Sequence, residues 1–167
     1  MKKKMIKVDF RRRREGKTDY NFREKALKSE LPRLVIRKTS HYIIAQIVES
    51  KEAQDVTIVY ANSKELDKFG WHYSHKNIPA AYLTGFLVAQ KAFKKKIKGA
   101  IADIGLQRST KGGKIYATIK GCSDNGIKIN YSEEIIPDDN RIRGAHTKAG
   151  KDTEKIFNEV KEKIKKL

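Results

Sequence analysis

Positive charge is unevenly distributed along this chain of 167 residues, and its placement limits what each segment can fold into. Residues 1–40 hold 15 Lys and Arg against 5 Asp and Glu, and residues 81–120 hold 9 against 1. The segments 41–80 and 121–167 are nearly neutral. A block of like charge repels itself, so we expect the N-terminal segment to be poorly ordered alone. Charge confined to two zones is typical of a protein that binds a polyanion through defined surfaces.

The composition excludes several classes of protein. The formal charge is +18, and hydrophobic residues make up only 38% of the chain, which allows one modest core. No run of 18 apolar residues occurs, and the first residues lead into more charge, so we expect no membrane span, no signal peptide and a cytoplasmic location. The single cysteine, Cys122, excludes an internal disulfide and a cysteine zinc finger.

Residues 1–31 form a basic arm in which aromatic side chains are interleaved with the charges. Guanidinium groups fork onto phosphates and aromatic rings stack on unpaired bases, so this pattern favours RNA binding. A solvated basic tail or a localisation signal is the alternative. The arm residues that we expect to contact RNA are Arg11, Arg12, Arg13, Arg14, Lys17, Tyr20 and Arg23.

Residues 32–130 carry the pattern of an α/β core. Apolar and β-branched runs predict strands at 34–37, 42–48 and 55–61, and their short links imply an antiparallel meander. Asn77 as N-cap and Pro79 in the first turn predict a helix that runs to the lysines at 94–98 and is capped by Gly99. A strand at 100–104 and a helix from Ile115 to about residue 124 complete a mixed sheet with helices against its faces.

Residues 131–167 read as a C-terminal extension. The segment 131–150 has no periodicity, and 152–167 predicts a last helix with one apolar stripe. The three predicted parts are therefore an arm at 1–31, a core at 32–130 and an extension at 131–167.

Two loops of the core carry further candidate residues. The loop 105–113 precedes a helix as phosphate-binding loops do, but it does not match a nucleotide-binding motif, so we expect RNA phosphate or a plain surface loop. Its basic residues are Arg108, Lys111 and Lys114. In the second loop, Trp71, His72 and His75 either stack on bases or form a core tryptophan with two exposed histidines. No Cys or paired carboxylate is close in sequence to these histidines, so we expect no metal and no cofactor.

Catalysis is poorly supported by the residues present. A two-metal nuclease needs several converging carboxylates, and the basic stretch 81–120 offers only Asp103. Cys122 lies on a helix face where packing explains it. We expect no catalytic residue and no small-molecule substrate. An RNA-processing enzyme with a nuclease-like core and a non-specific nucleic-acid packaging protein stay open as alternatives.

Several motifs, in order along the chain, resemble one known family. They include Arg12-Arg13-Arg14-Glu15-Gly16-Lys17-Thr18-Asp19-Tyr20, Leu34-Val35-Ile36-Arg37, Ser63-Lys64-Glu65-Leu66, Phe69-Gly70-Trp71, Asn77-Ile78-Pro79-Ala80-Ala81-Tyr82-Leu83-Thr84-Gly85, Asp103-Ile104-Gly105-Leu106, Lys120-Gly121 and Arg141-Ile142-Arg143-Gly144. The chain is similar, from about residue 7 to its end, to the archaeal form of universal large-subunit ribosomal protein eighteen, the homologue of the eukaryotic fifth large-subunit protein.

The resemblance implies a structural protein that binds 5S rRNA in the central protuberance, with large-subunit rRNA and neighbouring ribosomal proteins as further partners. It implies a three-layer α/β core with a mixed sheet, in a ribonuclease H-like arrangement without its active site. Lys2 to Lys4 and the last helix are where the family varies most. Beyond the arm and the two loops, the positions that we expect to face RNA on this basis are Arg33, Arg37, Lys76, Asn77, Arg141 and Arg143.

Overall fold

Three strands form the predicted meander. In the computed structural model, which describes residues 8–51, 54–147 and 150–167, β1 (Arg33–Lys38), β2 (Ile43–Lys51) and β3 (Gln54–Asn62) pair in antiparallel order. β4 (Ile101–Asp103) adds parallel to β1, so the sheet has the order β3-β2-β1-β4 and is mixed, as expected. Lys2 to Lys4 lie outside the described residues.

Strand alternation divides the sheet into a core face and an open face. Leu34 and Ile36 of β1 are wholly buried, whereas Arg33 and Arg37 point to the other face, where they meet acidic side chains. Because successive side chains of a strand point to opposite faces, one strand supplies both the core and the charged surface.

Two helices cover the core face. α3 (Ile78–Lys94) begins at Asn77, whose side-chain oxygen accepts a hydrogen bond from the Ala80 backbone N–H at 2.8 Å. α4 (Lys114–Asp124) lies against α3 along its length. Their approach requires glycine, since a Cβ at Gly85 would lie 2.0 Å from the Thr118 carbonyl oxygen and collide with it.

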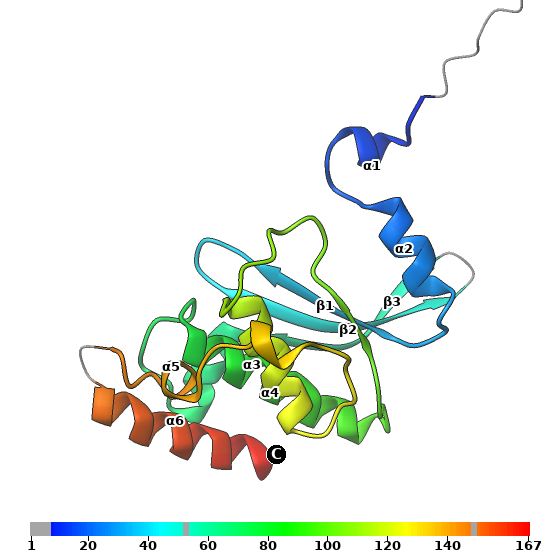
Figure 1. Cartoon of the computed structure of the whole chain (residues 1–167). Helices are drawn as coiled ribbons and strands as arrows, with labels where there is room; N and C mark the ends of the chain where they lie inside the picture. Colours follow the sequence, from blue (N-terminus) through cyan, green and yellow to red (C-terminus); the bar gives the residue numbers. More distant parts are fainter. Residues whose placement is uncertain (1–7, 52–53, 148–149) are drawn as a thin grey trace, which may run out of the picture.

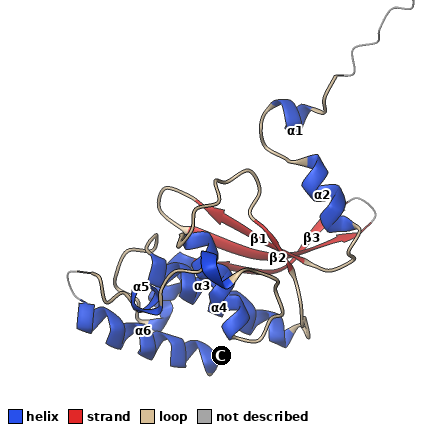
Figure 2. Ribbon diagram, viewed as in Figure 1, coloured by secondary structure: helices blue, strands red, loops and turns tan. Residues whose placement is uncertain are grey.

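The C-terminal helices lie on α3 and not on the sheet. α5 (Asp139–Arg143) and α6 (Gly150–Lys165) pack against α3, as does the 3-10 helix η1 (Ser63–Phe69); a second 3-10 turn, η2, spans Glu133–Ile135. The layers are therefore sheet, α3 with α4, then α6, as Figures 1 and 2 show. Both long helices of the core, α3 and α4, pack on the core face, and residues of the arm line a cavity on the open face.

The end of α3 also differs from the prediction. α3 ends at Lys94 with Lys95 as its C-cap, and Lys96 takes a left-handed backbone with φ 60°. Gly99 is not a cap; it forms a parallel bridge with Lys128. The lysine run thus leaves the helix and turns back toward β4, because the chain must reach the sheet.

The N-terminal arm contains two short helices, α1 (Arg11–Arg14) and α2 (Tyr20–Leu27). α1 stands away from the sheet, while α2 approaches the beginning of β3 (Figure 1). No helix within the described ranges is long and apolar enough to cross a membrane.

Candidate nucleic-acid interface

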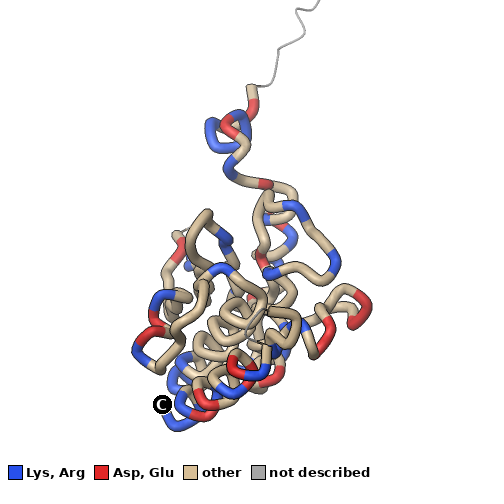
Figure 3. Tube along the Cα trace, turned by 90° about the vertical axis from the view of Figure 1, so that its left-hand side faces the viewer, with Lys and Arg blue, Asp and Glu red and all other residues tan. Residues whose placement is uncertain are grey.

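The four arginines of α1 are all exposed, and none of them is buried against the core. Arg11 lies 3.8 Å from Glu15 and Arg13 lies 3.7 Å from Asp9, both as solvent-exposed pairs. Exposed ion pairs of this kind contribute at most about 1 kcal/mol. The guanidinium groups can therefore exchange these partners for phosphate at little cost. Figure 3 shows the dense basic colouring of this segment.

Local contacts give the arm its shape. Arg12 Nε donates a hydrogen bond to Thr18 Oγ1 at 2.9 Å, which closes the turn between the two helices. Asp19 caps α2 by accepting from two backbone N–H groups of its first turn, at 3.0 and 3.1 Å. The rings of Phe10 and Tyr20 lie 5.1 Å apart, and Phe10 remains 70% exposed. An aromatic surface therefore accompanies the arginines, as the sequence pattern indicates.

A chain of alternating charges anchors the arm to the open face of the sheet. Arg23 donates two hydrogen bonds to Asp55, at 2.7 and 2.9 Å, and Arg33 also lies 2.9 Å from Asp55. Arg33 and Arg37 both pair with Asp103, at 2.8 and 3.1 Å. The Arg23 hydrogen bond is the main cause that holds the pKa of the Asp55 carboxyl well below its usual range.

This arginine–aspartate ladder changes the role of three predicted RNA contacts. Arg33 is only 4% exposed and links Asp55 of β3 to Asp103 of β4 within the sheet. Arg23 is engaged by two oxygens of one carboxylate and joins the arm to the sheet. Arg37 keeps part of its surface exposed beside Gly105. The sequence reading missed Asp55 altogether, since a lone acid on a predicted strand carries no signal of its partner.

The arm and the open face enclose a polar cavity of about 290 Å³. Arg12 and Lys17 line it from the arm, and Arg33 and Arg37 line it from β1. Five Lys and Arg side chains line the cavity against three carboxylates, those of Asp19, Asp55 and Asp103. The cavity therefore has the charge to accept an anionic group at its mouth.

A second basic cluster lies at the N-terminal ends of α3 and α4. Burial lowers the pKa of Lys114, and the positive charges of Lys76 and Lys38 lower it further. Three ammonium groups from β1, the loop before α3 and the start of α4 are thus close enough to repel one another. Arg108 and Lys111 are exposed on the adjoining loop 105–113. Lys38 was not among the predicted contacts, because its neighbours are distant in sequence.

The loop at 71–77 divides into core and surface residues. Trp71 is wholly buried, so stacking of this residue on a base is wrong and the core alternative holds. His72 is exposed, while His75 is half-buried and lies 2.6 Å from Asp67. Asn77 is half-buried and engaged as the cap of α3, which accounts for it structurally.

Arg141 and Arg143 lie apart from the arm. Both are exposed on α5, and Arg143 lies 3.5 Å from Glu154 of α6. α5 is on the side of α3 away from the sheet, so the structure does not bring these arginines together with the other candidates (Figure 1).

The groups that catalysis would need are engaged elsewhere. Asp103 is 5% exposed and its carboxylate is held by two arginines and by the Gly105 backbone N–H at 2.9 Å. Burial raises the pKa of the Cys122 thiol, which donates to the Gly85 carbonyl. Among the described residues, no three His, Cys, Asp or Glu side chains gather where they could hold a metal ion.

Comparison with known proteins gives the family. A family model described as "Ribosomal large subunit proteins 60S L5, and 50S L18" matches residues 4–98 and 94–132. The large ribosomal subunit protein uL18 of Korarchaeum cryptofilum is 56% identical over 140 residues, which are 84% of this chain and 72% of that protein. The uL18 of Methanoregula boonei is 48% identical over 142 residues, 85% of this chain and 82% of that protein. Matches of this extent show that the chain belongs to the family of ribosomal large-subunit proteins that comprises 60S L5 and 50S L18.

Proposed function

We propose that this chain binds 5S rRNA and helps to attach it to the large-subunit rRNA in the central protuberance. Family membership makes the chain a structural component of the large subunit of the cytoplasmic ribosome, and not an enzyme. The choice of 5S rRNA as the partner rests on the motifs of the sequence. With this family, the nuclease and packaging alternatives lose their support.

The anchored arginine arm is the observation that carries the proposal. The exposed arginines of α1 supply charge for phosphates, and Phe10 and Tyr20 supply rings beside them. Arg23 and Asp55 fix the C-terminal part of this arm on the sheet, which reduces the number of orientations that binding must select. Phosphate contacts position an RNA-binding protein, and stacking on unpaired bases adds selectivity.

The second basic cluster extends the proposed interface. Lys38, Lys76 and Lys114 repel one another in the free protein, and a phosphate group among them would relieve that repulsion. Arg108 and Lys111 continue the surface along the loop that crosses above the sheet (Figure 1). We infer that the RNA contacts both this surface and the arm.

The neutral segment 41–80 is proposed to meet neighbouring ribosomal proteins. β3 is an edge strand of the sheet, and its Val56 and Tyr60 are 51% and 43% exposed.

We also propose that the core is a variant of the ribonuclease H-like arrangement. The strand order and the bridge between Gly99 and Lys128, where a further parallel strand would begin, support this proposal. The division into arm, core and extension is part of the same proposal.

A gel-shift titration tests the RNA partner. The chain should bind 5S rRNA of a related archaeon more tightly than a tRNA, and equal affinity at moderate salt would contradict the specific claim. Neutralising about six phosphates should weaken binding roughly a thousandfold between about 50 and 200 mM salt.

Substitution of the arm tests its place in the interface. Replacing Arg11 to Arg14 with Ala should flatten the salt dependence of 5S rRNA binding. The matched control replaces three lysines of α6, Lys151, Lys155 and Lys165, together with Lys166 directly after it, and removes the same charge elsewhere. If both quadruple variants keep the wild-type salt slope, the arm is not part of the interface.

A further inference from the structure

Five lysines from two segments surround the C-terminal end of α3. The backbone brings the segments together, since the Lys128 N–H donates to the Lys98 carbonyl at 2.9 Å and the Ala100 N–H donates to the Lys128 carbonyl at 3.1 Å. All five side chains are exposed. We call this surface the lysine patch; it consists of Lys94, Lys95, Lys96, Lys98 and Lys128.

No acidic side chain neutralises the lysine patch. Within the described ranges, none of its five ammonium groups has an ion pair or a hydrogen bond. Nearby lysines differ, since Lys91 lies 2.6 Å from Glu65 and Lys120 lies 3.0 Å from Asp124. The negative, C-terminal end of the α3 dipole favours one or two cations. The remaining lysines of the patch are not explained by the fold.

The surface beside the patch is grooved. Two cavities of about 500 and 680 Å³ share Leu31, Lys98 and Gly99 as lining residues, so they form one continuous groove along the β4 edge. Its floor is aliphatic, and no aromatic or arginine side chain lines either cavity. Glu49 is the one acidic residue in the lining, and it lies 3.6 Å from Lys51.

This composition points to phosphates and not to bases. Stacking on unpaired bases needs aromatic or guanidinium planes, which the groove lacks. Lysine ammonium groups act as flexible point charges on a phosphate backbone. The patch therefore differs in kind from the arm, where arginines and aromatic rings occur together.

The patch is also remote from the proposed interface. α3 and α4 run in the same direction, because Gly85 meets Thr118 and Phe93 near the end of α3 meets Gly126 just after the end of α4. Lys76 and Lys114 stand at the N-terminal ends of these helices. The 17 residues of α3 span about 25 Å, so the two basic clusters lie at opposite ends of the helical layer.

We propose that the lysine patch binds the phosphate backbone of an RNA duplex, as a second RNA site independent of the arm. The proposal rests on the proposed function only in that the partner is RNA. Binding at the patch is independent of sequence, and a chain with two separated sites holds two RNA segments at once.

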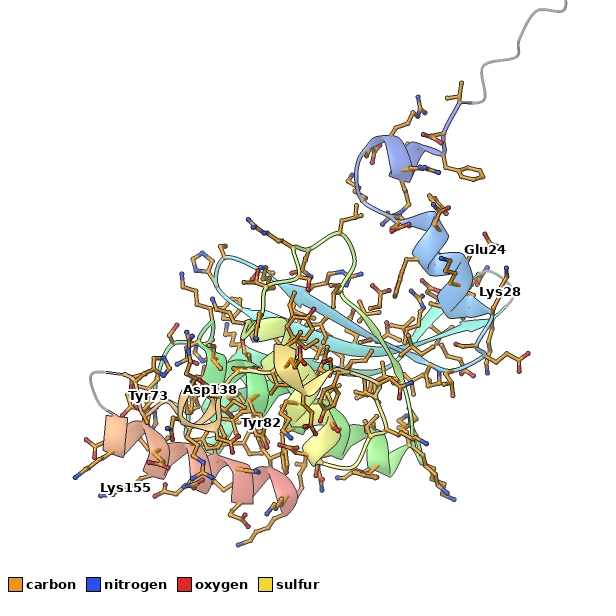
Figure 4. All side chains as sticks on the ribbon, viewed as in Figure 1. Glu24, Lys28, Tyr73, Tyr82, Asp138 and Lys155 are labelled. Carbon is orange, nitrogen blue, oxygen red and sulfur yellow. The ribbon has the colours of Figure 1, made fainter. Side chains whose placement is uncertain are left out.

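The test titrates an RNA duplex of about 16 base pairs, the length that duplex-binding domains cover. A fluorescent label on the duplex reports binding to the full chain, both free and after saturation with unlabelled 5S rRNA. The variant Lys95→Gln, Lys96→Gln, Lys98→Gln removes three charges of the patch. The control Lys151→Gln, Lys155→Gln, Lys163→Gln removes three charges from α6, where Lys155 lies on the other side of the molecule from the end of α3 (Figure 4).

The wild-type chain saturated with 5S rRNA should still bind the duplex. The patch variant should lower the salt slope of duplex binding by about 2 to 3 and keep its affinity for 5S rRNA, whereas the control should match the wild type. Equal duplex binding by the patch and control variants would overturn the proposal. So would patch-dependent binding of a polyglutamate peptide as tight as that of the duplex, which would assign the patch to an acidic protein. If the chain fails to bind 5S rRNA, the titration of the free chain still tests the patch.

Discussion

Replacement of Asp103 by Asn tests whether buried ion pairs hold the open face of the sheet. The carboxylate is buried and pairs with Arg33 and Arg37, and the Arg33 side chain is itself only 5% exposed. Removing one partner of a buried pair costs about 3–5 kcal/mol, because the other charge is left uncompensated. Asn keeps one carbonyl oxygen and Arg33 keeps Asp55, so we expect a loss of about 2–4 kcal/mol in the free energy of unfolding.

Thermal and urea unfolding followed by circular dichroism measure this loss. A domain of this length loses about 2–4 °C in Tm for each kcal/mol, so the midpoint should fall by roughly 5–15 °C. Asp138→Asn is the control, since it removes the same charge at an exposed position whose side chain caps nothing (Figure 4). Equal unfolding midpoints for the two variants would show that the ion pairs of Asp103 do not stabilise the open face of the sheet. The Asp103→Asn variant and the wild type should also degrade added RNA to the same extent, because Asp103 stabilises the fold and takes no part in catalysis.

Three further outcomes follow from the packing and charges. Gly121→Ala should prevent the close approach of α3 and α4, since its Cβ would lie 2.1 Å from the Tyr82 carbonyl oxygen; a wild-type Tm for this variant would contradict the model of the helical layer. Trp71→Ala should lower the free energy of unfolding by about 3–5 kcal/mol, measured in urea, while an exposed stacking residue would leave it unchanged. The Asp55 carboxyl, with its lowered pKa, stabilises the fold above about pH 4 and loses this contribution as pH falls, so acid unfolding should be less steep in Asp55→Asn. Identical acid titrations of that variant and the wild type would remove Arg23 and Asp55 as an anchor.

The elements of the fold were largely predictable from local patterns. Asn77 and Pro79 mark the start of α3. The side chain of an N-cap bonds a backbone N–H of the first turn, and the first turn also tolerates proline, which has no backbone N–H, so both signals are local in sequence. The strands 33–38, 43–51 and 54–62 follow β-branched runs. The end of α3 was not predictable, because the backbone at Lys96 turns to bring β4 beside β1, and that constraint is tertiary.

The candidate site was predictable only for residues that are exposed because of their own charge and that need no partner distant in sequence. The arginines of α1 are exposed as expected, since a dense block of like charge finds no core to enter. Arg33 was placed on the surface by motif, and Trp71 was left between base stacking and the core; both are buried. Their partners are distant in sequence: Asp103 meets Arg33 across the sheet, and a single sequence gives no measure of such pairs.

The central claim is that this chain selects 5S rRNA. The most direct measurement incubates the tagged chain with total RNA of an archaeon that carries a relative of it, such as Methanoregula boonei, and sequences the RNA that remains bound after washing at moderate salt. We expect 5S rRNA to be strongly enriched over tRNA, and we expect the variant with Arg11 to Arg14 replaced by Ala to lose this enrichment. Recovery of all RNAs in proportion to their abundance would contradict it.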